Sequence, residues 1–305
     1  MAKPSKPKFT KQMTLRQFDE LFPDDDACKT YLAARRWPNG VRCPRCDNDK
    51  VWALHARPFH WLCRNCSADG YRFSVIVETI FEETKIGLRD WFRVIHMMLT
   101  SKKGVAALEV QRVMGFGSYK TAHYMCHRIR AGLLDPNFRK LVGIVEADET
   151  FIGGKAKNKH IGKGRGGPGR GGMGSGKTPI AGAIERGGNV VARVINNVRK
   201  DTLTQFVREA VSDKVSLIVT DEWVGYNQVH EDFPTSIIRH THGEYVVGAV
   251  HANTIEGFWS LVKRGVVGTF HKVSRKYLPL YVAEFEFRYN NRHNPDIFGT
   301  AVAGC

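Results

Sequence analysis

Hydrophobic residues recur along this chain with two different patterns, and the change between them divides the sequence. In the first part, apolar positions three or four residues apart predict helices at 15–22, 24–36, 88–100, 105–114 and 118–134. From Leu141 onwards, short apolar runs alternate with helical segments, which is typical of an α/β domain. The expected order there is strand 142–148, strands 179–186 and 189–196, helix 201–212, strands 215–221 and 235–239, and helices 252–264 and 276–291.

Four cysteines interrupt the helical part in two C-x2-C pairs, with sixteen residues between the pairs: Cys43, Cys46, Cys63 and Cys66. Two such pairs supply four thiolates, which is the ligand set of a closed tetrahedral zinc site. The alternatives are four buried or free thiols, or a site that uses His55 or His60 instead. Because four sulfur ligands leave no position for a substrate, the pattern predicts a structural zinc in a zinc ribbon.

The helices at 105–114 and 118–134 flank a turn that contains Gly115 and Gly117. The second helix carries several basic residues, among them Lys120 and Arg128, so the pair suits a helix-turn-helix in a DNA groove. A plain helical hairpin with a solvated basic face fits the same pattern. We take Lys120 and Arg128 as candidate DNA contacts.

Composition narrows the class of partner. The chain has 305 residues, a formal net charge of +16 and 42% hydrophobic residues, so a core can form and a polyanion is favoured. The sequence contains no apolar run of 18 residues and no signal peptide, so we expect a cytoplasmic, nucleoid-associated protein that binds DNA and no membrane.

A glycine-rich insert at 153–177 holds 11 glycines and 7 lysines or arginines but no acidic residue. Such a segment buries too little apolar surface to order itself, and it could fold over a phosphate backbone. Its end, Gly171 to Thr178, matches the phosphate-binding pattern G-x-x-x-x-G-K-T. That loop needs a helix after it, whereas Pro179 and a strand pattern follow, so a chance match is favoured.

Three acidic residues are candidates for catalytic chemistry. Asp148 and Asp221 each close an apolar run, and Glu256 lies on an expected helix whose Asn253 and Lys263 share its face. Taken singly, each of these acids would be interpreted as a cap or a surface charge. Together, carboxylates at two strand ends and on a helix suit Mg²⁺ or Mn²⁺, and two such ions can drive a phosphodiester displacement.

Several motifs together resemble the zinc-ribbon insertion-sequence transposases of bacteria, of the ISXO2-like type. These are the four cysteines, Glu146-Ala-Asp148-Glu-Thr-Phe-Ile-Gly-Gly154, Asp221, His251 to Gly265, Gly268 to Ser274, and Glu284 to Asn290. The resemblance implies the DDE superfamily, a ribonuclease H-like catalytic domain, and Asp148, Asp221 and Glu256 as ligands of two Mg²⁺ or Mn²⁺ ions. It further implies that Lys263, with its neighbour Arg264, contacts the transposon end. Asn253 is the alternative third ligand, and Glu256 is preferred because a charged carboxylate holds Mg²⁺ better than an amide.

The expected organisation is a basic tail with N-terminal helices (1–36), a zinc ribbon (37–78), a helical DNA-binding linker (79–138) and an α/β, ribonuclease H-like catalytic domain (139–296). The expected function is a transposase, acting as a homo-oligomer on DNA, that cleaves the element ends and transfers the 3′-OH into target DNA without a covalent protein–DNA intermediate. The rival hypotheses are a non-catalytic zinc-ribbon DNA-binding regulator and a P-loop ATPase.

Overall fold

The computed structural model describes residues 12–66, 69–135, 138–153, 177–238 and 253–305. The chain forms two compact units, and the first is built from both ends of the sequence: Met1–Leu134 with Asn291–Cys305. The second unit is the continuous segment Asp135–Asn290. The division into four segments made above remains a prediction.

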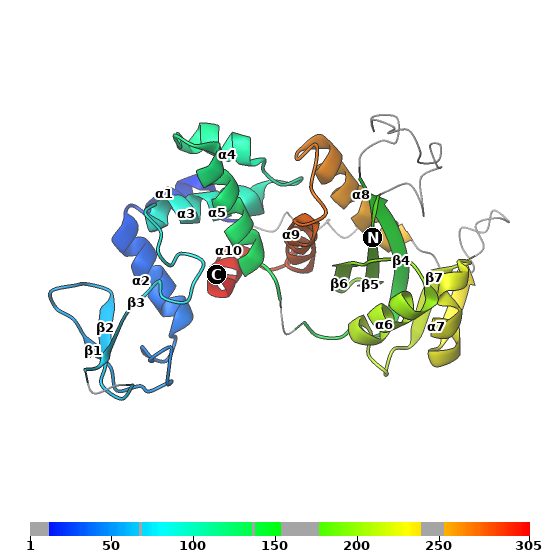
Figure 1. Ribbon diagram of the computed structural model, residues 1–305, viewed down its shortest axis with the longest axis horizontal. Coiled ribbons are helices and arrows are strands. Elements are labelled where there is room, and N and C mark those ends of the chain that lie inside the picture. The colour runs from blue at the N-terminus through cyan, green and yellow to red at the C-terminus, as the bar shows by residue number, and fades with distance from the viewer. Residues whose placement is uncertain (1–11, 67–68, 136–137, 154–176, 239–252) are drawn as a thin grey trace, which may run out of the picture. The chain divides into compact units, whose positions relative to one another are not determined.

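The first unit contains helices α1 (Leu15–Leu21), α2 (Asp25–Arg36), α3 (Leu88–Thr100), α4 (Ala107–Met114), α5 (Tyr119–Gly132) and α10 (Ile297–Gly304) (Figure 1). Helix α1 begins with a capping box, in which Thr14 and Gln17 satisfy each other's backbone N–H groups. The core of the first unit is aromatic: the rings of Phe18, Phe22 and Phe92 all lie within 6.2 Å of the Phe298 ring of α10. Helix α10 therefore completes a core whose other members come from the N-terminal helices.

A small antiparallel sheet belongs to the same unit. It has the order β1 (Trp52–Ala53), β2 (His60–Cys63), β3 (Tyr71–Ser74). A cluster of aromatic rings, including Trp37, Trp61 and Phe73, packs beside the cysteines. This core is small, so a further source of stability is needed.

The second unit is built on a mixed five-stranded sheet in the order β6-β5-β4-β7-β8. The strands are β4 (Ile144–Ile152), β5 (Thr178–Glu185), β6 (Val190–Val194), β7 (Leu217–Asp221) and β8 (Thr235–Ile238). Strand β5 runs antiparallel to β4 and β6, whereas β4, β7 and β8 run parallel. The expected α/β class is confirmed for this unit, and the mixed sheet is consistent with a ribonuclease H-like fold.

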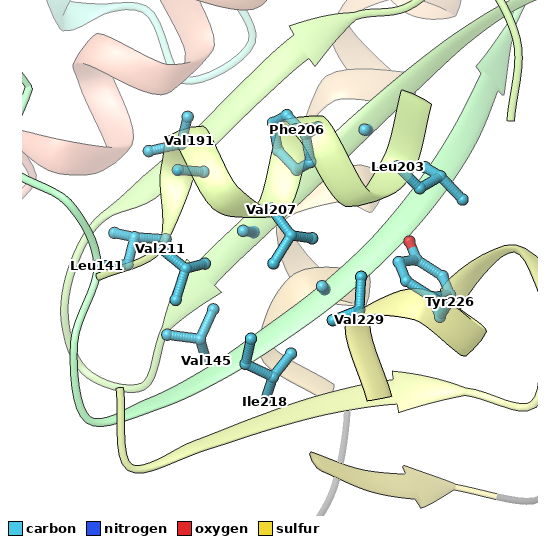
Figure 2. Packing of buried hydrophobic residues seen from close by; sticks show 14 of the residues in the cluster. Leu141, Val145, Val191, Leu203, Phe206, Val207, Val211, Ile218, Tyr226 and Val229 are labelled. Atoms are coloured by element: carbon cyan, nitrogen blue, oxygen red, sulfur yellow. The ribbon is translucent and has the colours of Figure 1, made fainter. Parts of the chain in front are cut away.

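Side chains alternate between the two faces along each strand, and both faces carry apolar side chains, so helices cover both faces of this sheet. On one face, α6 (Lys200–Ala210), the 3₁₀ helix η2 (Val224–Tyr226) and α7 (Asn227–Asp232) pack on residues such as Val145 and Ile218. Figure 2 shows Leu203, Phe206 and Val207 of α6 above the strands. On the other face, α8 (Asn253–Gly268) and α9 (Leu278–Asn290) pack on Ile180, Ile184 and Val190.

Two expectations about elements need correction. Asp148 does not follow the end of its strand, because β4 begins after Gly143, which has a φ of +67°, and continues to Ile152 through its pairing with β5. Helices α7 and α10 were not expected, since the first is short and the second is apolar on nearly every side. Within the described residues, no helix is long and apolar enough to cross a membrane.

Candidate metal and carboxylate sites

The four cysteines come together at the small sheet. Their sulfur atoms all lie within 4.8 Å of one another, with separations of 3.4 Å for Cys43–Cys66 and 3.7 Å for Cys46–Cys63. Tetrahedral zinc with bonds of about 2.3 Å requires sulfur atoms about 3.8 Å apart. The four residues therefore fit a closed zinc site, and neither His55 nor His60 belongs to the group.

The surroundings of three of the four cysteines shift the pKa of the thiol, and not all in the same direction. Cys43 begins a tight turn, in which its N–H donates to Asn48 and its carbonyl accepts from Asp47. The backbone N–H of Asn48 lowers the pKa of Cys46 to about 6, whereas burial raises the pKa of Cys63. Neighbouring thiols raise the pKa of Cys66, and a bound cation would relieve the repulsion between clustered thiolates.

The register of the large sheet brings Asp148 and Asp221 level with each other. Glu146 of β4 pairs with Val219 of β7 in the parallel ladder, and each aspartate lies two residues further along its strand. A shift of two residues keeps the side chain on the same face, so both carboxylates point to the face that α8 covers. The pairing of β4 with β7 ends at Glu146, so Asp148 lies just beyond it, although β4 itself continues to Ile152. The sequence had predicted the end of the strand at Asp148.

The two aspartates interact electrostatically. Burial, with the charge of Asp221 adding to it, raises the pKa of Asp148 to about 6, although the Glu149 backbone N–H, the Trp259 indole and Lys263 oppose this. Asp221 accepts a hydrogen bond of 3.1 Å from the backbone N–H of Trp223. Two half-buried carboxylates that repel each other are a donor set that a divalent cation would neutralise.

Helix α8 approaches this pair through Trp259, whose indole N–H donates to Asp148 Oδ2 at 3.0 Å. Glu256 lies one turn before Trp259 and Lys263 lies one turn after it, so these residues share a stripe of the helix. Among the described residues, the four cysteines are the one group of three or more Cys, His, Asp or Glu ligand atoms within 4.8 Å of one another. The structure thus pairs Asp148 with Asp221 and does not add Glu256 to them at that spacing.

A further carboxylate near the pair, that of Glu149, was not identified from the sequence. Glu149 points to the opposite face, where the buried Tyr226 hydroxyl donates to Glu149 Oε2 at 2.9 Å. Burial and the charges of Asp148 and Asp221 raise the pKa of Glu149 to about 7. Glu149 is next to Asp148 in the sequence, but its partner Tyr226 lies 77 residues away in helix η2, and no sequence pattern connects the two.

Close packing holds Trp259 over the sheet, and this leads to a stability prediction. A Cβ atom at Gly182, which pairs with Asp148, would lie 2.5 Å from the Trp259 ring. We expect Gly182→Ala to lower the free energy of unfolding by about 1–3 kcal/mol, because a buried indole has no room to move. Gly257→Ala is the control: nothing lies within 4 Å of its Cβ, so in mid-helix it should stabilise by roughly 0.5–1 kcal/mol. Urea unfolding measures both, and equal effects would contradict the packing argument.

The candidate DNA contacts of the first unit differ in their surroundings. Lys120 is exposed at the start of α5, where its backbone N–H donates to Ser118 Oγ. Arg128 instead donates to the carbonyl oxygens of Thr79 and Glu82 and to the Tyr124 hydroxyl. The turn between α4 and α5 has Gly115 in the left-handed conformation, with a φ of +66°, which glycine adopts readily at the end of a helix, and the helix-turn-helix remains a prediction.

Most of the glycine-rich insert and of its phosphate-loop pattern lies outside the described residues, as does the segment 239–252. Strand β5 begins at Thr178, directly after Lys177 of that pattern. A nucleotide-binding loop needs a helix there, so the structure does not support the ATPase hypothesis.

Comparison with known proteins supports one family over most of the chain. Residues 140–290 match the ISXO2-like transposase domain, and residues 23–69 match the transposase zinc-ribbon domain. A protein from Halobacterium salinarum, described as an uncharacterized protein in transposable element ISH50, is 27% identical over 276 residues. That alignment covers 88% of this chain and 91% of the relative. The zinc-ribbon match and the cysteine geometry together support a structural zinc, and the chain belongs to the zinc-ribbon, ISXO2-like DDE transposases of insertion sequences.

Proposed function

We propose that this protein cleaves DNA at the ends of its insertion sequence and transfers the freed 3′-OH into target DNA. The observation that carries the proposal is the pairing of Asp148 with Asp221 on the α8 face of the sheet, inside the matched transposase domain. The mixed sheet with helices on both faces supports a ribonuclease H-like catalytic domain. No observation favours a non-catalytic regulator.

Asp148 and Asp221 would hold the catalytic ions, with a third ligand from α8. Two Mg²⁺ or Mn²⁺ ions held there supply an activated nucleophile and a stabilised leaving oxygen. In the first step, a water oxygen bonds to phosphorus and the bond from phosphorus to the 3′ oxygen breaks, which leaves a 3′-OH. In the second step, that 3′-OH bonds to a target phosphorus and a target 3′ oxygen leaves, so no external energy source is needed.

The geometry of α8 supports Glu256 over Asn253 as the third ligand. Thr254 hydrogen-bonds to Glu146, and Trp259 hydrogen-bonds to Asp148. The five residue steps from Thr254 to Trp259 span about 7.5 Å of helix, and the two steps from Glu146 to Asp148 span about 6.6 Å of strand, so the helix runs along the strand. Glu256 lies between the two contacts, whereas Asn253 lies before the first.

DNA binding is proposed for two surfaces. Lys263 and Arg264 are exposed on α8, and Lys263 acts electrostatically on Asp148, so it suits a phosphate next to the reaction site. The exposed side of α5 with Lys120 suits a DNA groove. We further propose that the protein works as a homo-oligomer on chromosomal DNA in the cytoplasm.

Lys120 and Arg128 provide a matched test of the α5 surface. We expect Lys120→Ala to flatten the slope of log affinity against log salt by about 0.9, because one phosphate contact is lost, with no change in melting temperature. Arg128→Ala should lower the melting temperature, since the carbonyl oxygens of Thr79 and Glu82 lose their partner. Salt titrations of binding and thermal melts measure both. If Arg128→Ala flattened the salt dependence of binding and Lys120→Ala did not, Arg128 rather than Lys120 would be the DNA contact.

The proposed activity is tested with the purified protein and a labelled duplex that carries the repeats flanking its gene. In Mg²⁺ or Mn²⁺, the expected products are a strand ending in 3′-OH at the element boundary and its joining to a plasmid. Chelation by EDTA and a duplex with scrambled ends are the controls. Specific binding of the ends without cleavage in either metal would favour the regulator hypothesis.

A further inference from the structure

Glu146 lies two residues before Asp148 on the same face of β4 and is fully buried. Its carboxylate accepts four hydrogen bonds. Oε2 accepts from the backbone N–H groups of Thr254 (2.9 Å) and Ile255 (3.0 Å), and Oε1 accepts from the Thr254 hydroxyl (2.9 Å) and Arg186 Nε (3.0 Å). A strand residue therefore caps the start of helix α8.

This contact ties the helix to the sheet, whereas a cap from the helix's own chain segment would not. The first N–H groups of a helix have no partner within the helix, and a negative charge there is favourable. A buried carboxylate also needs all its partners, because an unpaired charge in the interior is costly. The carboxylate and the first turn of α8 thus hold each other in one relative position.

We propose that Glu146 is a positioning residue that sets α8 in register with β4 for DNA cleavage, an inference that rests on the proposed function. The Glu146–Thr254 contact and the Trp259–Asp148 contact are two attachment points of the helix on one strand. Glu256 lies between them, and its carboxylate can act with Asp148 and Asp221 only while both points hold. Arg186, which follows strand β5, neutralises the charge of Glu146.

A second buried carboxylate in the same unit supplies a matched control. Glu286 of α9 accepts hydrogen bonds from Ala192 N at 3.1 Å and Arg193 Nη1 at 3.0 Å. Like Glu146, it joins a helix to the sheet through a backbone N–H and an arginine, but neither of these bonds involves α8. We expect loss of either carboxylate to disturb the fold, and only loss of Glu146 to disturb the position of α8.

The test compares Glu146→Met with Glu286→Met in the full-length, zinc-loaded protein. In Glu146→Met we expect the Thr254–Ile255 segment to exchange its amide hydrogens about ten-fold faster or more, because charge-assisted bonds are lost. Cleavage of the element ends should fall about 10²-fold while end binding is retained, since a small misplacement suffices. Glu286→Met should change neither quantity by more than about two-fold. Glu146→Gln should recover part of both losses, because its carbonyl oxygen can still accept the two backbone N–H groups.

The possible outcomes separate the clamp, meaning the contact of Glu146 with the start of α8, from the proposed function. If the amide hydrogens of Thr254–Ile255 exchange at an unchanged rate in Glu146→Met, the clamp is overturned. Faster exchange with cleavage reduced no more than in Glu286→Met overturns the positioning role. If the wild type itself does not cleave its ends, the proposed function fails, and the exchange measurement still decides on the clamp. If Glu146→Met does not fold, Thr254→Val removes only the hydrogen bond from the Thr254 hydroxyl to Oε1 and should produce the same changes to a smaller degree.

Discussion

Replacement of Asp148 or Asp221 by alanine is expected to abolish strand cleavage and to leave binding of the element ends intact. Each carboxylate would hold an ion that supplies several kcal/mol of transition-state stabilisation, and 1.36 kcal/mol corresponds to ten-fold in rate. The expected loss is therefore at least about 10³-fold. Single-turnover cleavage of a labelled end in Mg²⁺, with binding measured in parallel, tests this.

The controls identify the ligand set. Asp213→Ala removes an exposed acid away from the pair and should cleave like the parent. Glu256→Gln should be impaired and Asn253→Ala should remain active. An inactive Asn253→Ala together with an active Glu256→Gln would assign the third ligand to Asn253. Normal cleavage by all the aspartate variants would rule out a two-metal nuclease built on these residues.

Loss of one zinc ligand is expected to unfold the small sheet of the first unit. Structural zinc contributes about 10–16 kcal/mol to such small units at neutral pH, and the aromatic cluster beside the cysteines is too small to replace it. We expect the wild type to hold close to one zinc per chain and Cys43→Ser or Cys66→Ser to lose it and bind DNA weakly. Elemental analysis after dialysis measures the zinc content.

Cys28→Ala is the control for this experiment. Cys28 is buried in α2 and does not belong to the cysteine group, so its replacement should keep the zinc content unchanged. Stoichiometric zinc and normal DNA binding in Cys43→Ser would contradict the four-thiolate site.

Much of the second unit was predictable because its elements alternate in a clear pattern. The strands that carry Asp148 and Asp221 and the helix that carries Glu256 were expected within a few residues of their observed bounds. Asp148 and Asp221 lie at the same height in the sheet because of the register between β4 and β7. The pattern within a single strand does not determine this register. The zinc site was predictable from spacing alone, because the two C-x2-C pairs already specify a four-sulfur shell.

The supporting contacts could not be predicted, because they join residues far apart in the sequence. The Glu146 carboxylate binds Thr254, which lies 108 residues away. Alternation along β4 puts Glu146 on the same face as Asp148, but only the packing of α8 shows which groups its carboxylate binds. Helix α10 escaped prediction because five of its eight residues are buried and it lacks the polar face that marks a surface helix.

The position of α10 has a consequence for the order in which the protein folds on the ribosome. Phe298 completes the aromatic core with Phe18 and Phe22, and the backbone N–H of Ile80 donates to the carbonyl of Cys305. Because a ribosome makes Phe298 and Cys305 after residues 135–290, the first unit cannot close its core until the whole Asp135–Asn290 unit has been synthesised. A chain that terminated before α10 would therefore emerge with its helical core open.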